Sequence, residues 1–219
     1  YITSQVPGAG KNVLVLHPRS RPGFTTAEGQ RFDFVSGRID TKGKFQFAYG
    51  SAAARMKLPA GPGCWPAFWL MGDGSWPENG EIDVMECVGE EDWISCALHG
   101  PGYFGQSALV NKLFFPNGQD ATCWHIYSVD WAPDRIVFKV DGATIYRVTR
   151  PMVHFFGSWV FDDKKYLILN VALGGVYPFK TNGMRSPYYG IAKETVNKVR
   201  NNQAKVYVDW VRVQGHTSV

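Results

Sequence analysis

Short apolar runs separated by glycine- and proline-containing turns recur along the whole chain. Many runs are rich in β-branched or aromatic residues, and several alternate apolar with polar positions, as strands with one buried face do. The pattern predicts strands at 11–16, 33–40, 45–58, 64–71, 80–88, 93–98, 125–131, 135–140, 143–148, 166–173 and 204–213. Asp141-Gly142 indicates a tight hairpin, and only 192–200 has a helical pattern. This spacing favours one all-β sandwich domain over residues 1–219.

Composition excludes several classes of protein. Hydrophobic residues make up 45% of the 219 residues and aromatic residues 15%, which argues against disorder. No run reaches the roughly 18 apolar residues that a membrane span needs. The net charge of +4 comes without a block of Lys or Arg, so neither a nucleic acid nor a membrane is an expected partner. The aromatic content exceeds what a core of this size requires.

The four cysteines, Cys64, Cys87, Cys96 and Cys123, match no zinc-binding spacing. Four cysteines allow three pairings, and the sequence does not choose among them. Cys87 and Cys96 have the parity of core-facing residues on adjacent predicted strands, so a disulfide between them and buried free thiols both remain open.

Three acids fall within six residues of an otherwise apolar strand, at Glu81, Asp83 and Glu86. Glu81 and Asp83 share a face, whereas a regular strand would turn Glu86 to the other side. One extra residue, a bulge around Val84-Met85, would return Glu86 to the acid face. Crowded carboxyls raise the pKa of at least one member. A neutral acid beside ionised carboxylates is what glycoside hydrolysis needs, with Glu81 and Glu86 as the working pair and Asp83 tuning Glu81.

A solvated acidic face or a cation site is the alternative interpretation of such a string, but the apolar neighbours and the tryptophans upstream favour catalysis. The segment Glu81-Ile82-Asp83-Val84-Met85-Glu86 resembles the active-site strand of glycoside hydrolase family 16, and specifically its laminarinase-like (endo-β-1,3-glucanase) branch. Residues 36–45, 49–50, 54–59, 65–70 and 207–213 resemble laminarinase-type segments in the family's order. The resemblance covers nearly the whole chain.

The resemblance implies a jelly-roll (concanavalin A-like) β-sandwich whose concave sheet forms the substrate cleft. It implies that Glu81 is the nucleophile, Glu86 the acid/base and Asp83 the assisting residue of a retaining mechanism. The working carboxyls should then lie about 5–5.5 Å apart. The bulged form of the motif, marked by Met85, occurs in laminarinases, agarases and carrageenases. The expected activity is endo-hydrolysis of β-1,3-glucan, with mixed-linkage β-1,3-1,4-glucan as a further candidate substrate.

Three tryptophans precede the acids. Trp65 and Trp69 are four residues apart on one predicted strand, so they share a face and are candidates for stacking on sugar rings; two core tryptophans are the alternative. Trp76 lies in the loop before Glu81 and is a candidate subsite wall.

Three polar residues are further substrate-binding candidates. His99 differs in parity from its core-facing neighbours and is expected to face the cleft and hydrogen-bond sugar or Glu86, with a structural histidine as the alternative. Arg38 matches a substrate-binding arginine of laminarinase-like members, with a surface salt bridge as the alternative. Asn170, polar within an apolar run, either faces the cleft or satisfies backbone groups.

The resemblance also bears on metals and partners. Asp209 matches the carboxylate ligand of a structural calcium site on the family's convex face, and catalysis itself requires no cofactor. The expected partner is a β-glucan polysaccharide or oligosaccharide, bound by a secreted monomer. Two departures stand out: Ala53 replaces a common Glu, and residues 1–219 lack a counterpart of the family's N-terminal segment, which contributes to the cleft.

Three other functions are compatible with the same resemblance. One is an agarase- or carrageenase-type galactan hydrolase, and another is a transglycosylase, in which sugar replaces water in the second step. The third is a non-catalytic glucan-binding protein, against which the intact set of Glu81, Asp83 and Glu86 argues.

Overall fold

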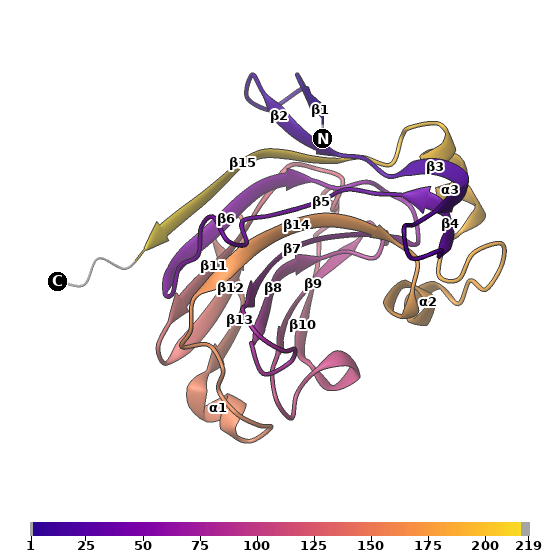
Figure 1. Ribbon diagram of the computed structural model, residues 1–219. Coiled ribbons are helices and arrows are strands. Elements are labelled where there is room, and N and C mark those ends of the chain that lie inside the picture. The colour runs from indigo at the N-terminus through magenta and orange to yellow at the C-terminus, as the bar shows by residue number, and fades with distance from the viewer. Residues whose placement is uncertain (1, 216–219) are drawn as a thin grey trace.

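Two antiparallel β-sheets lie face to face in the computed structural model, which describes residues 2–215 (Figure 1). The seven-stranded sheet has the order β1 (Ile2–Ser4), β2 (Val13–Leu16), β15 (Val206–Gly215), β6 (Gly50–Lys57), β11 (His125–Ala132), β12 (Arg135–Val140) and β13 (Ala143–Thr149). The six-stranded sheet has the order β10 (Leu109–Phe114), β9 (Trp93–His99), β8 (Glu81–Glu86), β7 (Cys64–Gly72), β14 (Lys165–Leu173) and β5 (Arg38–Asp40). The predicted all-β sandwich is confirmed.

The core fills the space between the sheets because alternate residues of each strand point inward. On β6 every second residue, from Ala52 to Met56, is fully buried. The largest buried side chains include Trp131 from the seven-stranded sheet and Phe68 from the six-stranded one. Trp131 therefore belongs to the core, and its indole N–H donates to the Phe161 carbonyl at 2.9 Å.

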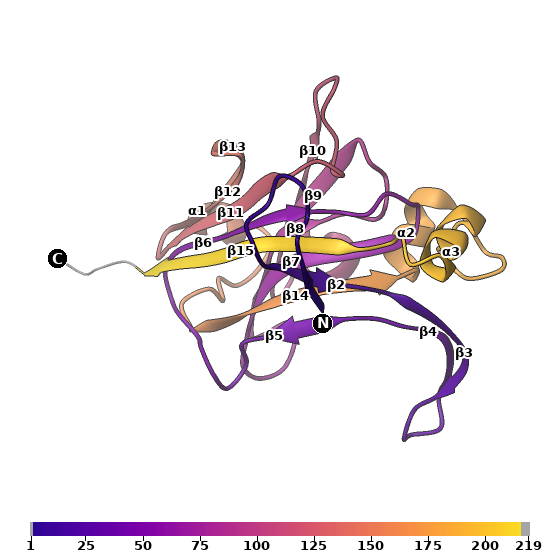
Figure 2. The ribbon, with the colours of Figure 1, turned by 90° about the horizontal axis from the view of Figure 1, so that it is seen from above.

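Several elements differ from the predicted pattern. The strand predicted at 33–40 is two strands, β4 (Arg31–Val35) and β5, which pair in different sheets. The unexpected strand β3 (Arg19–Thr25) forms a hairpin with β4 that extends away from the sandwich (Figure 2). The short helices α1 (Arg150–His154) and α2 (Val176–Asn182) and the 3-10 turn η1 (Gly105–Ser107) were not expected from the sequence.

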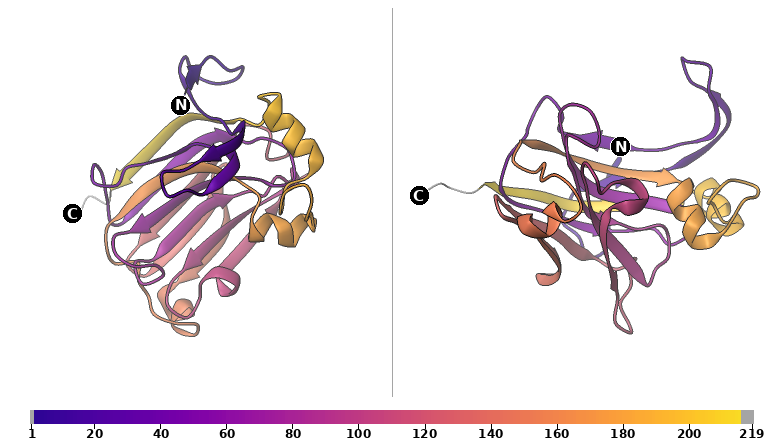
Figure 3. Two further views of the ribbon diagram at one scale, coloured as in Figure 1. Left: turned by 45° about the vertical axis from the view of Figure 1, so that its right-hand side comes forward. Right: turned by 90° about the horizontal axis from the view of Figure 1, so that it is seen from below.

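The expected helix at 192–200 is confirmed as α3 (Lys193–Arg200), but the prediction that it is the only helical segment is wrong. Figure 3 places α2 and α3 together at one end of the sandwich, away from α1. Within residues 2–215 no helix combines the length and apolar character that crossing a membrane requires.

All four cysteines are free thiols. Cys64, Cys87 and Cys96 are buried, whereas Cys123 is exposed. Burial raises the pKa of the Cys87 thiol to about 12, so this thiol is neutral and unreactive at ordinary pH. Of the two alternatives left by the sequence, buried free thiols hold for Cys87 and Cys96.

Glycines shape two of the turns between strands. At the predicted hairpin, Asp141 and Gly142 both have positive φ, 49° and 82°. Gly89, just after β8, has φ +89°, and a Cβ there would lie 1.8 Å from the Gly61 carbonyl oxygen. The Gly61 N–H donates to the Gly89 carbonyl at 3.1 Å, so the turns before β7 and after β8 are joined backbone to backbone.

Gly89→Ala should therefore destabilise the protein more than Gly118→Ala. Gly118 has nearly the same φ, +86°, but a Cβ there has nothing within 4 Å. Gly118→Ala should cost about 1 kcal/mol of unfolding free energy for the left-handed backbone alone. Gly89→Ala should cost at least about 2 kcal/mol more, because the backbone must move. Urea denaturation measures both, and equal losses would show that the contact with Gly61 is not tight.

Candidate active site

A bulge in β8 brings the three acids onto one face. Across β9, Asp83 lies opposite Ala97 and Glu86 opposite Ser95, so three steps on β8 match two steps on β9. The extra residue lets Val84 and Met85, which follow one another, both point into the core, with 1% and 0% exposure. Glu86 is thereby returned to the face of Asp83, as predicted.

The acids line a cavity on the face of the six-stranded sheet that points away from the core. Its volume is about 250 Å³. The lining combines carboxyls, indoles and one amide, from Trp65, Ala67, Trp69, Glu81, Asp83, Glu86, Asn170 and Ala172. The structure thus brings together the predicted acids, two of the predicted tryptophans and Asn170.

Glu86 has the properties of a general acid. The pKa of Glu86 is raised to about 7, mainly by burial; the hydrogen bond from Trp65 lowers it in part, and the charge of Glu81 adds to the rise. The Trp65 indole N–H donates to Glu86 Oε1 at 2.9 Å. Near neutral pH a large share of Glu86 therefore carries the proton that a leaving oxygen needs.

Glu81 and Asp83 form the other half of the cluster. The Trp76 indole N–H donates to Glu81 Oε2 at 2.6 Å, which places Trp76 beside the acids; its role as a subsite wall stays a prediction. Asp83 is 2% exposed. Burial, followed by the charges of Glu81 and Glu86 and by a hydrogen bond to Glu81, raises the pKa of Asp83 well above its ordinary value. A protonated Asp83 can donate a hydrogen bond to Glu81 and so orient its carboxyl.

His99 faces the acids but lies against Asp83, not against Glu86; the alternative that it hydrogen-bonds sugar stays a prediction. Its Nε2 lies 3.0 Å from Asp83 Oδ2. The register explains this, because His99 lies opposite Glu81 whereas Glu86 lies opposite Ser95 at the other end of β8. The Gly105 N–H donates to His99 Nδ1 at 3.1 Å, so the proton of the neutral ring is on Nε2.

Burial lowers the pKa of His99, which keeps the ring neutral. His99 therefore presents an N–H, and not a positive charge, to Asp83. The ligand atoms of Glu81, Asp83 and His99 lie within 4.8 Å of one another, as in a metal site. A protonated Nε2 has no lone pair for a metal ion, so the hydrogen-bonding pattern fits an acid cluster better than a metal centre.

Trp69, Asn170 and Arg38 lie next to one another along the cleft. The Trp69 indole N–H donates to Asn170 Oδ1 at 2.7 Å, so Asn170 faces the cleft and orients Trp69. The Arg38 guanidinium lies 5.0 Å from the Trp69 ring centre. Arg38 Nε is also 3.7 Å from Asp40 Oδ2 in an exposed pair, so Arg38 combines a cleft position with a surface salt bridge.

Two aromatic residues at the site were missed by the sequence analysis. Tyr177, on α2, packs edge-on against Trp65 with ring centres 5.6 Å apart, and its hydroxyl lies 3.0 Å from Ser95 Oγ. Phe104 packs edge-on against Trp76 at 5.3 Å. Tyr177 follows Gly174-Gly175, and that glycine pair, which ends β14, was the available sequence signal for a loop reaching into the cleft.

Asp209 lacks the surroundings of a calcium ligand. Its Oδ1 accepts from the Gly10 N–H at 2.8 Å, and its Oδ2 accepts from Arg55 Nη1 at 2.6 Å. The same Arg55 nitrogen donates to the Gly8 carbonyl at 2.8 Å. A guanidinium thus occupies the position between carboxylate and carbonyl that a hard cation would need, so the residues do not fit calcium.

Comparison with known proteins places these features in a family. The sequence profile described as "Glycosyl hydrolases family 16" matches residues 12–212. The chain is 35% identical over 195 residues to glucan endo-1,3-beta-glucosidase A1 of Niallia circulans, covering 82% of this chain and 26% of that protein. It is 33% identical over 182 residues to a beta-glucanase of Rhodothermus marinus, covering 77% of this chain and 60% of that protein.

The structure resembles the X-ray structure of an endo-beta-1,3-glucanase from Pyrococcus furiosus with a TM-score of 0.82. The two chains are 35% identical, and the match covers 94% of this chain and 76% of that one. By contrast, the chain spans only about a quarter and three-fifths of the length of the Niallia and Rhodothermus proteins.

The hydrogen bond from Trp65 predicts a specific change in pH dependence. It stabilises ionised Glu86, so Trp65→Phe should raise the pKa of Glu86 and move the alkaline limb of kcat/KM upward by roughly half a pH unit or more. Trp69→Phe is the matched control, because the Trp69 N–H donates to Asn170. The alkaline limb of kcat/KM should therefore lie at higher pH in Trp65→Phe than in Trp69→Phe. An alkaline limb at the same pH in the two variants would show that Trp65 does not set the acidity of Glu86.

Burial of Glu86 also predicts a pH-dependent stability. Because its pKa is raised in the folded state to about 7, the carboxyl destabilises the fold increasingly as pH rises from about 4 through 7. Glu86→Gln should therefore raise stability by ~2 kcal/mol at pH 8 and by little at pH 4. Thermal denaturation at the two pH values measures this, and an equal gain at both would contradict a titrating Glu86.

Proposed function

Because the chain belongs to glycosyl hydrolase family 16, we propose that it is an endo-acting, retaining β-1,3-glucanase, with mixed-linkage β-1,3-1,4-glucan as a second substrate. The observation that carries this proposal is the division of labour between two carboxyls on one bulged strand. Glu86 has a pKa raised to about 7, and Glu81 is held by the Trp76 N–H beside a protonated Asp83. The relatives named as endo-β-1,3-glucanases support the linkage and the endo mode.

In the first step Glu86 donates its proton to the glycosidic oxygen while Glu81 attacks the anomeric carbon, giving a glycosyl-enzyme intermediate. As the Glu81 carboxylate forms the new bond and loses negative charge, its hydrogen bond from Asp83 becomes weaker. Asp83 therefore acts mainly before the attack, by orienting the Glu81 carboxyl. The Trp76 N–H fixes the same carboxylate from the other side. Both contacts are neutral, so neither one quenches the nucleophile as a cation would.

In the second step Glu86, now ionised, removes a proton from water, and the water attacks the anomeric carbon. The Trp65 N–H stabilises Glu86 in this charged state at 2.9 Å. Two inversions at one carbon give net retention. A carboxyl with a pKa near 7 is suited to act as acid in the first step and as base in the second, because both protonation states are populated at neutral pH.

Glucan fits the lining of the cavity better than a sulfated galactan. The three charged groups that line it are carboxyls. Arg38, whose guanidinium lies against Trp69, is the nearby cation, and Asp40 offsets its charge. The indoles of Trp65 and Trp69 have their N–H groups committed to protein partners, so their ring planes are fixed and suited to stacking on the apolar faces of uncharged sugars.

A polysaccharide substrate also bears on location and assembly. Long glucans lie outside the cell, so we propose that the protein is secreted. We further propose that the protein acts as a monomer, because its own three acids, Glu81, Asp83 and Glu86, line one cavity.

Glu81→Gln should reduce hydrolysis of a soluble β-1,3-glucan at least about 10³-fold, because the nucleophile is lost, while oligosaccharide binding persists. Glu28→Gln, a change of an exposed carboxyl on the β3–β4 hairpin, is the control. Product analysis of the wild-type protein on laminarin, barley mixed-linkage glucan, agarose and carrageenan tests the substrate. Turnover of agarose without laminarin, or full activity in Glu81→Gln, would refute the proposal.

A further inference from the structure

The segment that begins with α1 exposes an apolar patch that the cleft does not use. We define the α1 patch as Met152, Phe155 and Phe156, which are 43%, 87% and 57% exposed. An exposed apolar cluster of this kind on a folded protein is often a binding surface. The buried Val153, between these residues in sequence, anchors the segment to the core.

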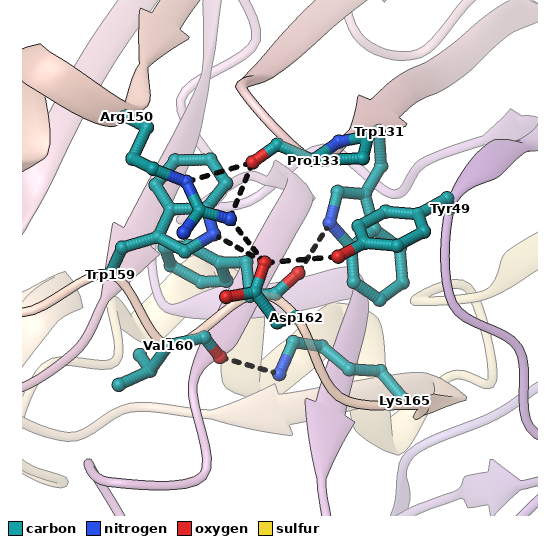
Figure 4. A network of polar contacts seen from close by, with 9 residues as sticks. Tyr49, Trp131, Pro133, Arg150, Trp159, Val160, Asp162 and Lys165 are labelled. Carbon is teal, nitrogen blue, oxygen red and sulfur yellow. Dashed lines mark hydrogen bonds and ion pairs between the residues drawn. The ribbon is translucent and has the colours of Figure 1, made fainter.

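A network of polar contacts holds this segment in place (Figure 4). Asp162 accepts hydrogen bonds from Tyr49 at 2.9 Å and from Trp159 at 3.1 Å, and it pairs with Arg150, the first residue of α1. Arg150 also donates from Nε and Nη2 to the Pro133 carbonyl at 2.9 and 2.6 Å, and its guanidinium lies 4.9 Å from the Trp159 ring centre.

These contacts affect the charge of the network as well as its geometry. Although burial alone would raise it, the hydrogen bonds from Arg150, Tyr49 and Trp159 hold the pKa of Asp162 below its ordinary value. Asp162 is therefore ionised across the working pH range. The α1 patch is presented on a fixed support, which lowers the entropy cost of binding a ligand there.

The α1 patch is joined to the cleft by direct backbone packing. A Cβ on Gly157 would lie 1.8 Å from the Pro101 carbonyl oxygen, and a Cβ on Gly102 would lie 2.3 Å from the Phe156 carbonyl oxygen. The Ser158 N–H donates to the Pro101 carbonyl at 3.2 Å. Figure 3 shows α1 and the loop that carries η1 at the same end of the sandwich.

Phe104 continues this connection toward the acids. It lies two residues after Gly102, a span of at most about 7 Å of backbone. Phe104 is 43% exposed and packs against Trp76, which is 44% exposed and donates to Glu81. Exposed aromatic side chains therefore run from the nucleophile through Trp76 to Phe104, and the loop of Phe104 packs against the backbone of Phe156.

We propose that the α1 patch is a second polysaccharide-binding site, which holds a stretch of the glucan chain beyond the catalytic cavity. The inference rests on the proposed function, since it takes the same polymer as the ligand. Phe155 and Phe156 offer faces on which the C–H surfaces of sugar rings can stack. Trp76 and Phe104, which pack against each other, lie between the acids and the loop that contacts the backbone of the patch.

The dimensions of the patch favour a sugar chain over a protein partner. A stable protein interface buries about 800 Å² on each side. An aromatic side chain can bury about 150–250 Å², so two partly exposed phenylalanines and a methionine fall short of that area. A polysaccharide needs only a few aromatic platforms in a row, and it gains affinity by engaging the cavity and the patch together.

The test compares a long and a short substrate. The double variant Phe155→Ala/Phe156→Ala should lower the ratio of kcat/KM on a long linear β-1,3-glucan to kcat/KM on a short β-1,3-oligosaccharide at least roughly fivefold. Phe114→Ala is the matched control, because Phe114 is 62% exposed but packs against Trp93 at the opposite end of β10. It should leave the ratio unchanged, and Phe155→Trp should preserve it.

A binding measurement separates this inference from the proposed function. In the Glu81→Gln background, binding to insoluble β-1,3-glucan should weaken to a similar extent in the double variant and stay the same with Phe114→Ala. Equal binding and an equal ratio in the double variant would overturn the inference while leaving the glucanase proposal intact. A wild-type dimer that the double variant abolishes would assign the patch to a second copy and also overturn it. No turnover of any β-glucan by the wild type would refute the glucanase proposal itself.

Discussion

Two consecutive core-facing residues, Val84 and Met85, decide the arrangement of the active site. A strand can place neighbours on the same side only where its pairing skips a residue. Here that skip returns Glu86 to the face of Glu81 and Asp83 and turns Met85 into the core beneath. Met85 is suited to this position because its unbranched side chain adapts to irregular space, and it is fully buried. The core therefore stabilises a local distortion from which the chemistry follows.

Three carboxyls in one buried cluster must be held without being neutralised by cations. The protein meets this constraint with neutral groups: one indole N–H donates to Glu86, another donates to Glu81, and an uncharged His99 lies 3.0 Å from Asp83. A lysine or arginine in these positions would lower the pKa values and remove the acid. Neutral neighbours orient the carboxyls, whereas burial and repulsion between the carboxyls decide which of them holds a proton. The tryptophan content of the cleft thus serves electrostatics as well as sugar stacking.

The sequence contained the strand parity, the need for a bulge and the identity of the acids, because these depend on near neighbours along the chain. It did not contain the partners of the side chains, which depend on register between distant strands. His99 is the clearest case: its face was predictable, but its alignment with Glu81 is set by the pairing of β8 with β9. Asp209 is another, since Arg55, on the neighbouring β6, approaches it across the sheet. The helices α1 and α2 are too short to produce a periodic pattern.

The approach to Glu81 and the support of α1 depend on one buried cation. Lys165, at the start of β14, is fully buried and donates to the carbonyls of Asn79 at 2.8 Å and Val160 at 3.2 Å. Its ammonium lies 5.5 Å from the Phe161 ring centre, and burial lowers its pKa to about 8.

Asn79 ends the loop that carries Trp76 to the nucleophile, whereas Val160 precedes Asp162, which anchors Arg150. An ammonium shared by both carbonyls therefore fixes the two loops relative to each other. Glycine is required beside this ammonium, since Gly80 has φ +65° and a Cβ there would lie 2.5 Å from the same Val160 carbonyl oxygen. The carbonyls stabilise an otherwise costly buried charge. In return, the charge places the catalytic carboxylate and the distant aromatic patch in one rigid frame.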